Sequence, residues 1–140
     1  MTTTLTDVLF IDDDKATNFF NTRVAQNYGK FSSISSVQSG LEGLNYLKGC
    51  IQSETQIPKL IFLDINMPAM NGWEFLNEFK KLKKNIFNET CVVILSTSTE
   101  PDDISKFEHC KNILDFINKP INTQAINKIF EKIKNLQKSA

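Results

Sequence analysis

The chain has 140 residues, and its 16 lysines and arginines balance its 16 aspartates and glutamates. This length fits one domain with its own core, because such domains usually hold ~100–200 residues. A balanced charge argues against a general nucleic-acid or anionic-membrane surface, which needs a basic excess. The apolar runs are far shorter than the ~20 residues of a membrane helix, and the N-terminus lacks the pattern of a signal peptide. We therefore expect neither a nucleic-acid partner nor membrane association.

Cysteine usage indicates the compartment. Cys50, Cys91 and Cys110 are odd in number and lack the spacing of a metal site. Such thiols suit a reducing environment, so the expected localisation is cytoplasmic. We expect residues 1–140 to form one domain, with a core over about residues 6–138 and no output domain.

Strand and helix signals alternate from one end of the chain to the other. Short apolar or β-branched runs predict strands at Asp7–Ile11, Phe31–Val37, Leu60–Asp64, Cys91–Leu95 and Ile113–Ile117. The Ser-rich second run is expected at a sheet edge. Helical spacing predicts helices at Lys15–Tyr28, Ser39–Ile51, Trp73–Lys84, from Pro101 to near His109, and around the stripe Ile126, Ile129, Phe130 and Ile133. Five β-α repeats with short connections predict a parallel sheet with helices on both faces.

Charged side chains follow three of the predicted strands. Asp12, Asp13 and Asp14 follow the first, Asp64 ends the third, and Lys119 comes just after the fifth. Ligands of open α/β sheets bind beyond the carboxyl ends of the strands, where these side chains would meet. Helix capping explains one aspartate, but not three in a row. Carboxylates ~4 Å apart repel by about 4 kcal/mol at an effective dielectric near 20, so a divalent cation is the natural compensation.

The chain resembles a response-regulator receiver domain over nearly its whole length. Four segments carry the resemblance in order and spacing: VLFIDDD, LIFLDINMPAMNGWEFL, VVILSTS and DFINKPI. The second is the most specific, with Asp64 followed by Met67-Pro68 and Asn71-Gly72. The resemblance implies an α/β fold with a doubly wound, five-stranded parallel sheet, flavodoxin-like, with strand order 2-1-3-4-5 and five helices. It also implies a single-domain module of two-component or phosphorelay signalling.

The resemblance assigns chemistry to the strand ends. Asp64 would be the phosphoacceptor, taking a phosphoryl group from a phosphohistidine on a histidine kinase or a histidine phosphotransfer protein. Asp13 would bind Mg²⁺ directly, and Asp12 would act largely through water. Asp64 and the backbone carbonyl of Asn66 would complete the protein ligands. This donor set is chemically reasonable, since Mg²⁺ prefers oxygen ligands and retains several waters.

Further positions have implied roles. Ser96 would donate its hydroxyl to a phosphoryl oxygen, and Lys119 would pair with another. The Lys119-Pro120 bond would be cis. Phe116 stands where the family places an aromatic side chain that changes rotamer on activation, so Phe116 and Ser96 are the expected switch residues. Two departures from the common pattern are Thr97, which is bulky enough to narrow access to the site, and the missing hydroxyl of Phe116.

Three functions compete. The leading one is a phosphoacceptor module whose phosphorylation changes its binding to an unknown downstream protein. Such a module is not an enzyme, apart from catalysing its own phosphorylation and dephosphorylation. An aspartyl-phosphate phosphatase using Asp64 as nucleophile is the second, but Asn66 stands where such an enzyme needs an acid/base Asp. The third is a degenerate receiver that binds partners without phosphorylation. The intact set of Asp13, Asp64, Ser96 and Lys119 disfavours it.

Some aromatic and titratable residues have simpler interpretations. His109, the one histidine, is expected at the surface, and Trp73 is expected to pack on a helix face. Phe19 and Phe20 are adjacent on the first predicted helix and cannot both point inward. One of the two is therefore expected to contribute to a partner surface.

Overall fold

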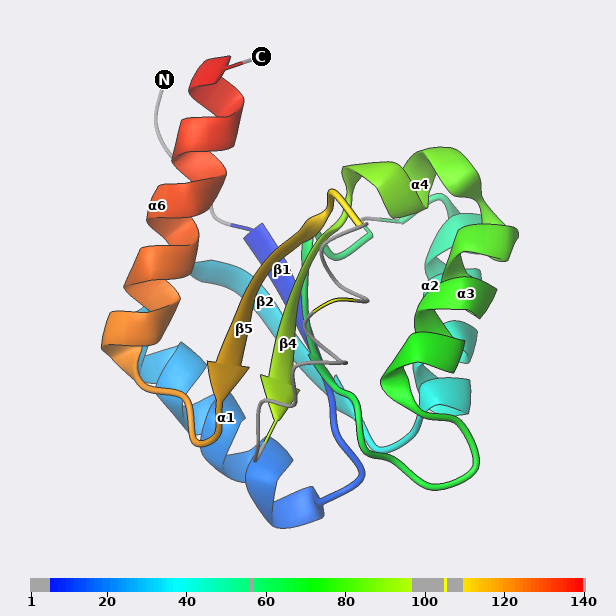
Figure 1. Ribbon diagram of the computed structural model, residues 1–140, viewed down its shortest axis with the longest axis horizontal. Helices are drawn as coiled ribbons and strands as arrows, with labels where there is room; N and C mark the ends of the chain where they lie inside the picture. The colour runs from blue at the N-terminus through cyan, green and yellow to red at the C-terminus, as the bar shows by residue number, and fades with distance from the viewer. Residues whose placement is uncertain (1–5, 56, 97–104, 106–109, 140) are drawn as a thin grey trace.

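Five parallel strands form one sheet in the order β2-β1-β3-β4-β5 (Figure 1). The computed structural model describes residues 6–55, 57–96, 105 and 110–139. The strands are Thr6–Ile11 (β1), Phe31–Val37 (β2), Leu60–Asp64 (β3), Cys91–Ser96 (β4) and Ile113–Asn118 (β5). The doubly wound sheet with strand order 2-1-3-4-5 is therefore confirmed, and the Ser-rich β2 lies at an edge as predicted.

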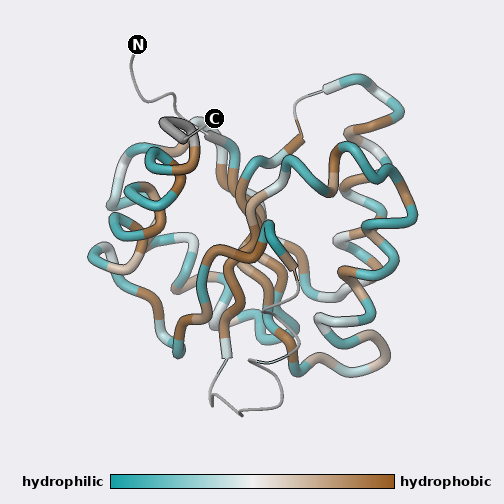
Figure 2. Tube along the Cα trace, turned by 45° about the horizontal axis from the view of Figure 1, so that its top comes forward, coloured by the Kyte–Doolittle hydropathy of each residue, from teal (hydrophilic) through white to brown (hydrophobic). Residues whose placement is uncertain are grey.

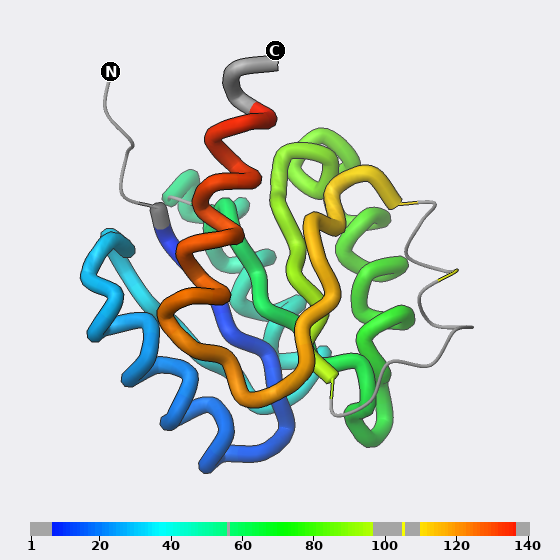
Figure 3. The backbone as a smooth tube through the Cα atoms, turned by 60° about the vertical axis from the view of Figure 1, so that its left-hand side comes forward, coloured from blue at the N-terminus to red at the C-terminus, as the bar shows by residue number. Residues whose placement is uncertain are grey.

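Helices cover both faces of this sheet. Helices α1 (Lys15–Tyr28) and α6 (Thr123–Ser139) lie side by side on one face, as Figures 1 and 3 show from different directions. Helices α2 (Gly40–Ser53), α3 (Gly72–Leu82) and α4 (Lys84–Glu89) cover the other face. Among the described helices, none combines the length and the apolar character that crossing a membrane requires.

The region after α3 differs from the prediction. The helix predicted over Trp73–Lys84 ends at Leu82, because Lys83 is extended at φ −162° and ψ 104°. The short helix α4 then follows, which the sequence patterns did not predict. It is held by Phe87, whose ring packs edge-on against Phe79 at a centroid distance of 5.2 Å. The helix predicted from Pro101 to near His109 lies outside the described residues except for residue 105.

The strands are apolar on both faces because helices cover both. Leu9 and Ile11 point into the core beneath α2 and α3, whereas Val8 and Phe10 point into the core beneath α1 and α6. On the second side Phe10 and Phe62 stack with ring centroids 5.0 Å apart. Figure 2 shows the result as a hydrophobic centre inside a mostly hydrophilic surround. The packed sheet is a rigid base for the residues at its edge.

The register brings the carboxyl ends of four strands close to one level. Ile11 pairs with Leu63 on the neighbouring parallel strand, so that the next residues, Asp12 and Asp64, lie at the same level. Asp64 pairs with Leu95 on β4, and Ser96 pairs with Asn118 on β5. The residues immediately after β1 and β5, and those at the ends of β3 and β4, therefore meet at one edge of the sheet.

Candidate functional site

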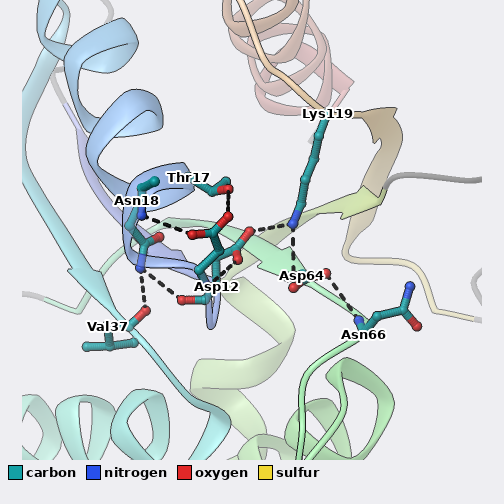
Figure 4. A network of polar contacts seen from close by, with 9 residues as sticks. Asp12, Thr17, Asn18, Val37, Asp64, Asn66 and Lys119 are labelled. Atoms are coloured by element: carbon teal, nitrogen blue, oxygen red, sulfur yellow. Dashed lines mark hydrogen bonds and ion pairs between the residues drawn. The ribbon is translucent and has the colours of Figure 1, made fainter.

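Asp12 is held in place by its backbone and by its side chain. It is buried, and its Oδ1 accepts a hydrogen bond from the backbone N–H of Asp14 at 2.9 Å. The side-chain amide of Asn18, from the first turns of α1, donates to the Asp12 carbonyl at 2.9 Å and to the Val37 carbonyl at 2.9 Å (Figure 4). One amide group thus joins the ends of β1 and β2 and fixes the loop that carries the aspartates.

The two following aspartates have different environments. Asp14 caps α1, since its Oδ1 accepts from the Ala16 N–H at 3.1 Å and its Oδ2 accepts from the Thr17 hydroxyl at 2.8 Å. Capping therefore accounts for this member of the run. Asp13 is exposed, and its carboxylate remains near the other acids. Asp12, Asp13 and Asp64 each offer an oxygen, and these oxygens lie within 4.8 Å of one another.

The loop after β3 positions Asp64. This residue is 4% exposed, and its Oδ1 accepts from the backbone N–H of Asn66 at 3.1 Å. The loop closes when the Gly72 N–H donates to the Ile65 carbonyl at 3.0 Å. A Cβ at Gly72 would lie 2.9 Å from the Ile65 Cα, a distance that real Cβ atoms essentially never show. The close approach explains the glycine of the Asn71-Gly72 pair.

Lys119 links the two buried carboxylates. Its Nζ lies 2.6 Å from Asp12 Oδ2 and 3.5 Å from Asp64 Oδ2 (Figure 4). Its backbone N–H donates to the Ser96 carbonyl at 2.8 Å, which ties the end of β5 to the end of β4. The Lys119-Pro120 peptide bond is cis, as the resemblance implied.

Burial and neighbouring charges shift the ionisation of this cluster. Burial raises the pKa of Asp64 from 3.8 to about 6, and the Asp12 carboxylate adds to the rise. The hydrogen bond from Asn66 opposes it. Burial alone would lower the pKa of Lys119, but the adjacent Asp12 and Asp64 carboxylates outweigh it and leave that pKa raised. Near neutral pH both groups are charged.

The charges of the cluster fit a divalent cation. Three ionised carboxylates and one ammonium leave a net charge of −3 + 1 = −2 on Asp12, Asp13, Asp64 and Lys119. Oxygen-only donors are those that Mg²⁺ prefers, and an exposed member such as Asp13 leaves room for the waters that this ion retains. The residues present therefore fit a magnesium ion. Lys119 would then be available to a second anion, such as a phosphoryl group.

The structure brings most of the predicted site residues together and adds one. Asp12, Asp13, Asp64 and Lys119 form the cluster, Asn66 flanks it, and Ser96 is fully buried at the end of β4. Phe116 is partly buried and packs against the core beneath α2 and α3, and Thr97 lies outside the described residues. Sequence reasoning missed Asn18. The sequence feature that could have identified it is an amide side chain on the face of the first helix that packs against the sheet, where an apolar residue is expected.

Comparison with known proteins identifies the family. A model of the response regulator receiver domain matches residues 8–131. The chain belongs to this family. Its members are phosphoacceptor signalling modules, and neither the phosphatase nor the degenerate receiver is favoured.

The fold agrees with a two-component response regulator from Cytophaga hutchinsonii, at 34% identity and a TM-score of 0.87, over 95% of this chain and 99% of that one. A two-component response regulator from Legionella pneumophila gives 31% identity and a TM-score of 0.77, over 93% and 98%.

Relatives known by sequence belong to proteins of different lengths. The receiver domain is 24% identical to the probable methanogenesis regulatory protein FilR2 of Methanothrix harundinacea, over 91% of this chain and 80% of that protein. It is 27% identical to the sensor histidine kinase CheAY of Helicobacter pylori, over 89% of this chain but only 14% of the kinase. The shared unit is therefore the receiver domain alone.

Proposed function

We propose that Asp64 accepts a phosphoryl group from a phosphohistidine of a histidine kinase or histidine phosphotransfer protein, with Mg²⁺ bound, and that this changes binding to a downstream protein. The observation that carries the proposal is the arrangement around Asp64. Its carboxylate shares the Lys119 ammonium with Asp12 and has an oxygen within 4.8 Å of those of Asp12 and Asp13. One nucleophile thus stands beside a cation and a divalent-metal donor set.

The transfer requires an ionised Asp64. One carboxylate oxygen forms a bond to phosphorus while the phosphorus–nitrogen bond of the donor breaks, and that bonding pair remains on the imidazole nitrogen. A pKa of about 6 leaves most of Asp64 deprotonated at neutral pH, even in the metal-free protein. The hydrogen bond from the Asn66 N–H to Oδ1 orients the carboxylate and leaves Oδ2, on the Lys119 side, as the attacking oxygen.

The remaining residues stabilise the transferred group. Mg²⁺, held by Asp13, Asp64 and the Asn66 carbonyl with Asp12 acting through water, would neutralise charge on the phosphoryl oxygens. In our proposal Lys119 exchanges its Asp12 and Asp64 partners for a phosphoryl oxygen, and the Ser96 hydroxyl donates to another. Phe116 and Ser96 are the proposed switch residues, since they lie on β5 and β4, the two strands whose ends would contact the phosphoryl group.

We further propose that the chain acts as a signalling module in the cytoplasm. Asn66 supports the exclusion of a small-substrate phosphatase, because a carboxamide cannot serve as the acid/base group. Cys50, Cys91 and Cys110 are free thiols, which fits a reducing compartment.

The test is phosphorylation by acetyl phosphate, followed by intact mass spectrometry. The wild-type protein should gain one phosphoryl group with Mg²⁺ and none with EDTA. Asp64→Asn should gain none, and Asp115→Asn, which alters an aspartate paired with Lys132 away from the cluster, should label like the wild type. Equal labelling of Asp64→Asn and wild type would refute the proposal.

A further inference from the structure

The two edges of the sheet are protected to different degrees. At the β5 edge, the Lys132 ammonium donates to the Leu114 carbonyl at 3.3 Å and pairs with Asp115 at 2.9 Å, so charged side chains guard this strand. Strand β2 has seven residues and carries no charged side chain, proline or glycine. Within the described residues, no further strand pairs with its outer side. Proteins usually block an exposed edge with charged residues or proline, and an unblocked edge can pair with another chain.

The hydrogen bonds of β2 show which main-chain groups are available. Residues Ser33–Val37 pair with β1 in continuous register, beyond an irregularity at the start of the strand. The Val37 carbonyl accepts from the Asp12 N–H at 3.2 Å, so the main-chain groups of Val37 face β1. These groups alternate in direction along a strand, so those of Ile34 and Ser36 point to the outer edge. Each of these two residues therefore offers one donor and one acceptor to a further strand.

Helix α1 presents an aromatic ring above the same edge. The helix packs on β2 and against α6, and α6 packs on β5. Tyr28 lies on the flank next to α6, since its hydroxyl donates to Asn127 at 3.0 Å. Phe19 precedes Tyr28 by about 2.5 turns of the helix and therefore lies on the opposite flank, toward the outer edge of β2.

Phe19 is the most exposed of the large apolar side chains in the described part of the chain. It is 66% exposed, ahead of Leu41, Leu136 and Phe20. The expectation that Phe19 or Phe20 leaves the core is confirmed, since both are exposed. An aromatic ring in this position adds apolar surface to the open edge of the sheet, and such surfaces typically mark a contact with another molecule.

The charges at the two ends of β2 indicate the partner. Lys30 is exposed immediately before the strand, and its ammonium lies 5.9 Å from the centroid of the Tyr28 ring. After the strand, a Glu42 oxygen accepts from the Gln38 N–H at 2.8 Å, which places a carboxylate at this end. An antiparallel copy of the strand would bring Lys30 of each chain to the Glu42 end of the other. The edge thus complements itself, as a symmetric dimer requires.

We propose that β2 pairs in antiparallel orientation with β2 of a second copy of this chain. The twofold axis passes Ser35, the midpoint of the stretch that pairs with β1 in continuous register. Ile34 of each copy then pairs with Ser36 of the other, and each pair exchanges two hydrogen bonds. The outer flanks of the two α1 helices meet across the axis, which covers Phe19.

The first test is the oligomeric state, measured by sedimentation equilibrium at about 10–500 µM protein, where small interfaces associate. The wild-type protein should approach about 32 kDa, twice the 16.0 kDa of one chain. Ser36→Lys adds an ammonium at an exposed position of the edge and should raise the dissociation constant at least about tenfold. Asn77→Lys adds the same charge at an exposed position of α3 and should leave it unchanged. Both variants should keep the wild-type circular dichroism spectrum.

A second pair of variants tests the contribution of α1. Phe19→Ala should raise the dissociation constant about tenfold, because an aromatic ring that the dimer covers is lost from both copies. Leu136→Ala is the matched control, since it removes an exposed apolar side chain from α6. This control should leave the dissociation constant unchanged.

Cross-linking tests the register. In the proposed dimer Ser35 lies opposite Ser35 of the second copy as a pair without mutual hydrogen bonds, whose Cα atoms are ~4.5 Å apart. A disulfide spans Cα distances of ~4.4–6.8 Å, so Ser35→Cys should form a linked dimer under mild oxidation. Ser33→Cys would lie opposite Val37 and should cross-link no more than the wild type. The wild type corrects for the three natural free thiols, Cys50, Cys91 and Cys110.

The outcomes decide the proposal independently of the phosphoryl chemistry. The joined strands run in opposite directions, so the two Asp64 sites lie at opposite ends of the sheet, and acetyl phosphate should label Ser36→Lys like the wild type. A wild-type protein that stays at 16.0 kDa throughout would overturn the dimer. A dimer that neither Ser36→Lys nor Phe19→Ala weakens would use another surface, which also contradicts the proposal. Equal cross-linking of Ser33→Cys and Ser35→Cys would exclude the proposed register.

Discussion

Neutralising Asp64 should stabilise the metal-free protein in a pH-dependent manner. Its folded-state pKa of about 6 exceeds the ordinary value of 3.8, so the folded state binds the proton more tightly than the unfolded state. The associated stability is complete below about pH 4 and is lost as the pH rises through 6. About two pKa units correspond to about 3 kcal/mol. Asp64→Asn avoids this loss, so its advantage over wild type should grow from near zero at about pH 4 to about 3 kcal/mol at about pH 8.

The assay is urea denaturation of both proteins in EDTA across this pH range. Asp14→Asn is the control with the opposite sign, because hydrogen bonds from Thr17 and Ala16 lower the pKa of Asp14. Its carboxylate contributes stability that is present at neutral pH and lost on acidification. Asn caps helices as well as Asp does, so the cap itself is preserved. An Asp64→Asn advantage that is equal at both pH extremes, or absent at about pH 8, would refute the electrostatic reasoning.

Two further predictions concern the metal and the loop after β3. Asp13→Asn should weaken Mg²⁺ binding by at least about tenfold, as measured by titration of Trp73 fluorescence, and an unaltered titration would count against direct ligation. Gly72→Ala should lower the free energy of unfolding by about 1–3 kcal/mol, because the new Cβ meets the Ile65 backbone. In the control Gly49→Ala, the new Cβ faces open space within α2 and should raise the free energy of unfolding by about 0.5–1 kcal/mol. Similar effects of the two glycine variants would contradict the steric argument.

The strands were predictable because their pattern depends on local sequence and burial alone. Leu60–Asp64 is buried throughout, and the apolar run before Asp64 had the same bounds in the prediction. Helix α4 was not predictable in this way. It has six residues and no side-chain cap, and its packing of Phe87 on Phe79 depends on the tertiary structure. Strong local patterns therefore predicted the strands of the sheet. The local pattern of α4 was too weak to predict a helix that tertiary packing stabilises.

The same distinction applies to the site. Parallel topology brings the residues after the strands to one edge, which is why Asp12, Asp64 and Lys119 could be grouped from sequence. The partner of Lys119 could not be anticipated. The 2.6 Å contact with Asp12 Oδ2 depends on the loop geometry that Asn18 maintains through carbonyls of two strands. A search for hydrophobic periodicity does not identify polar side chains on the buried face of a helix, such as Asn18, as functional residues.

The most direct measurement of the central claim is to locate the phosphoryl group. The wild-type protein would be phosphorylated by acetyl phosphate with Mg²⁺ and then reduced with borohydride, which converts an acyl phosphate of aspartate to homoserine. Peptide mass spectrometry should find homoserine at position 64 and unmodified aspartate at Asp12 and Asp13. Homoserine at Asp12 or Asp13, with Asp64 intact, would contradict the account.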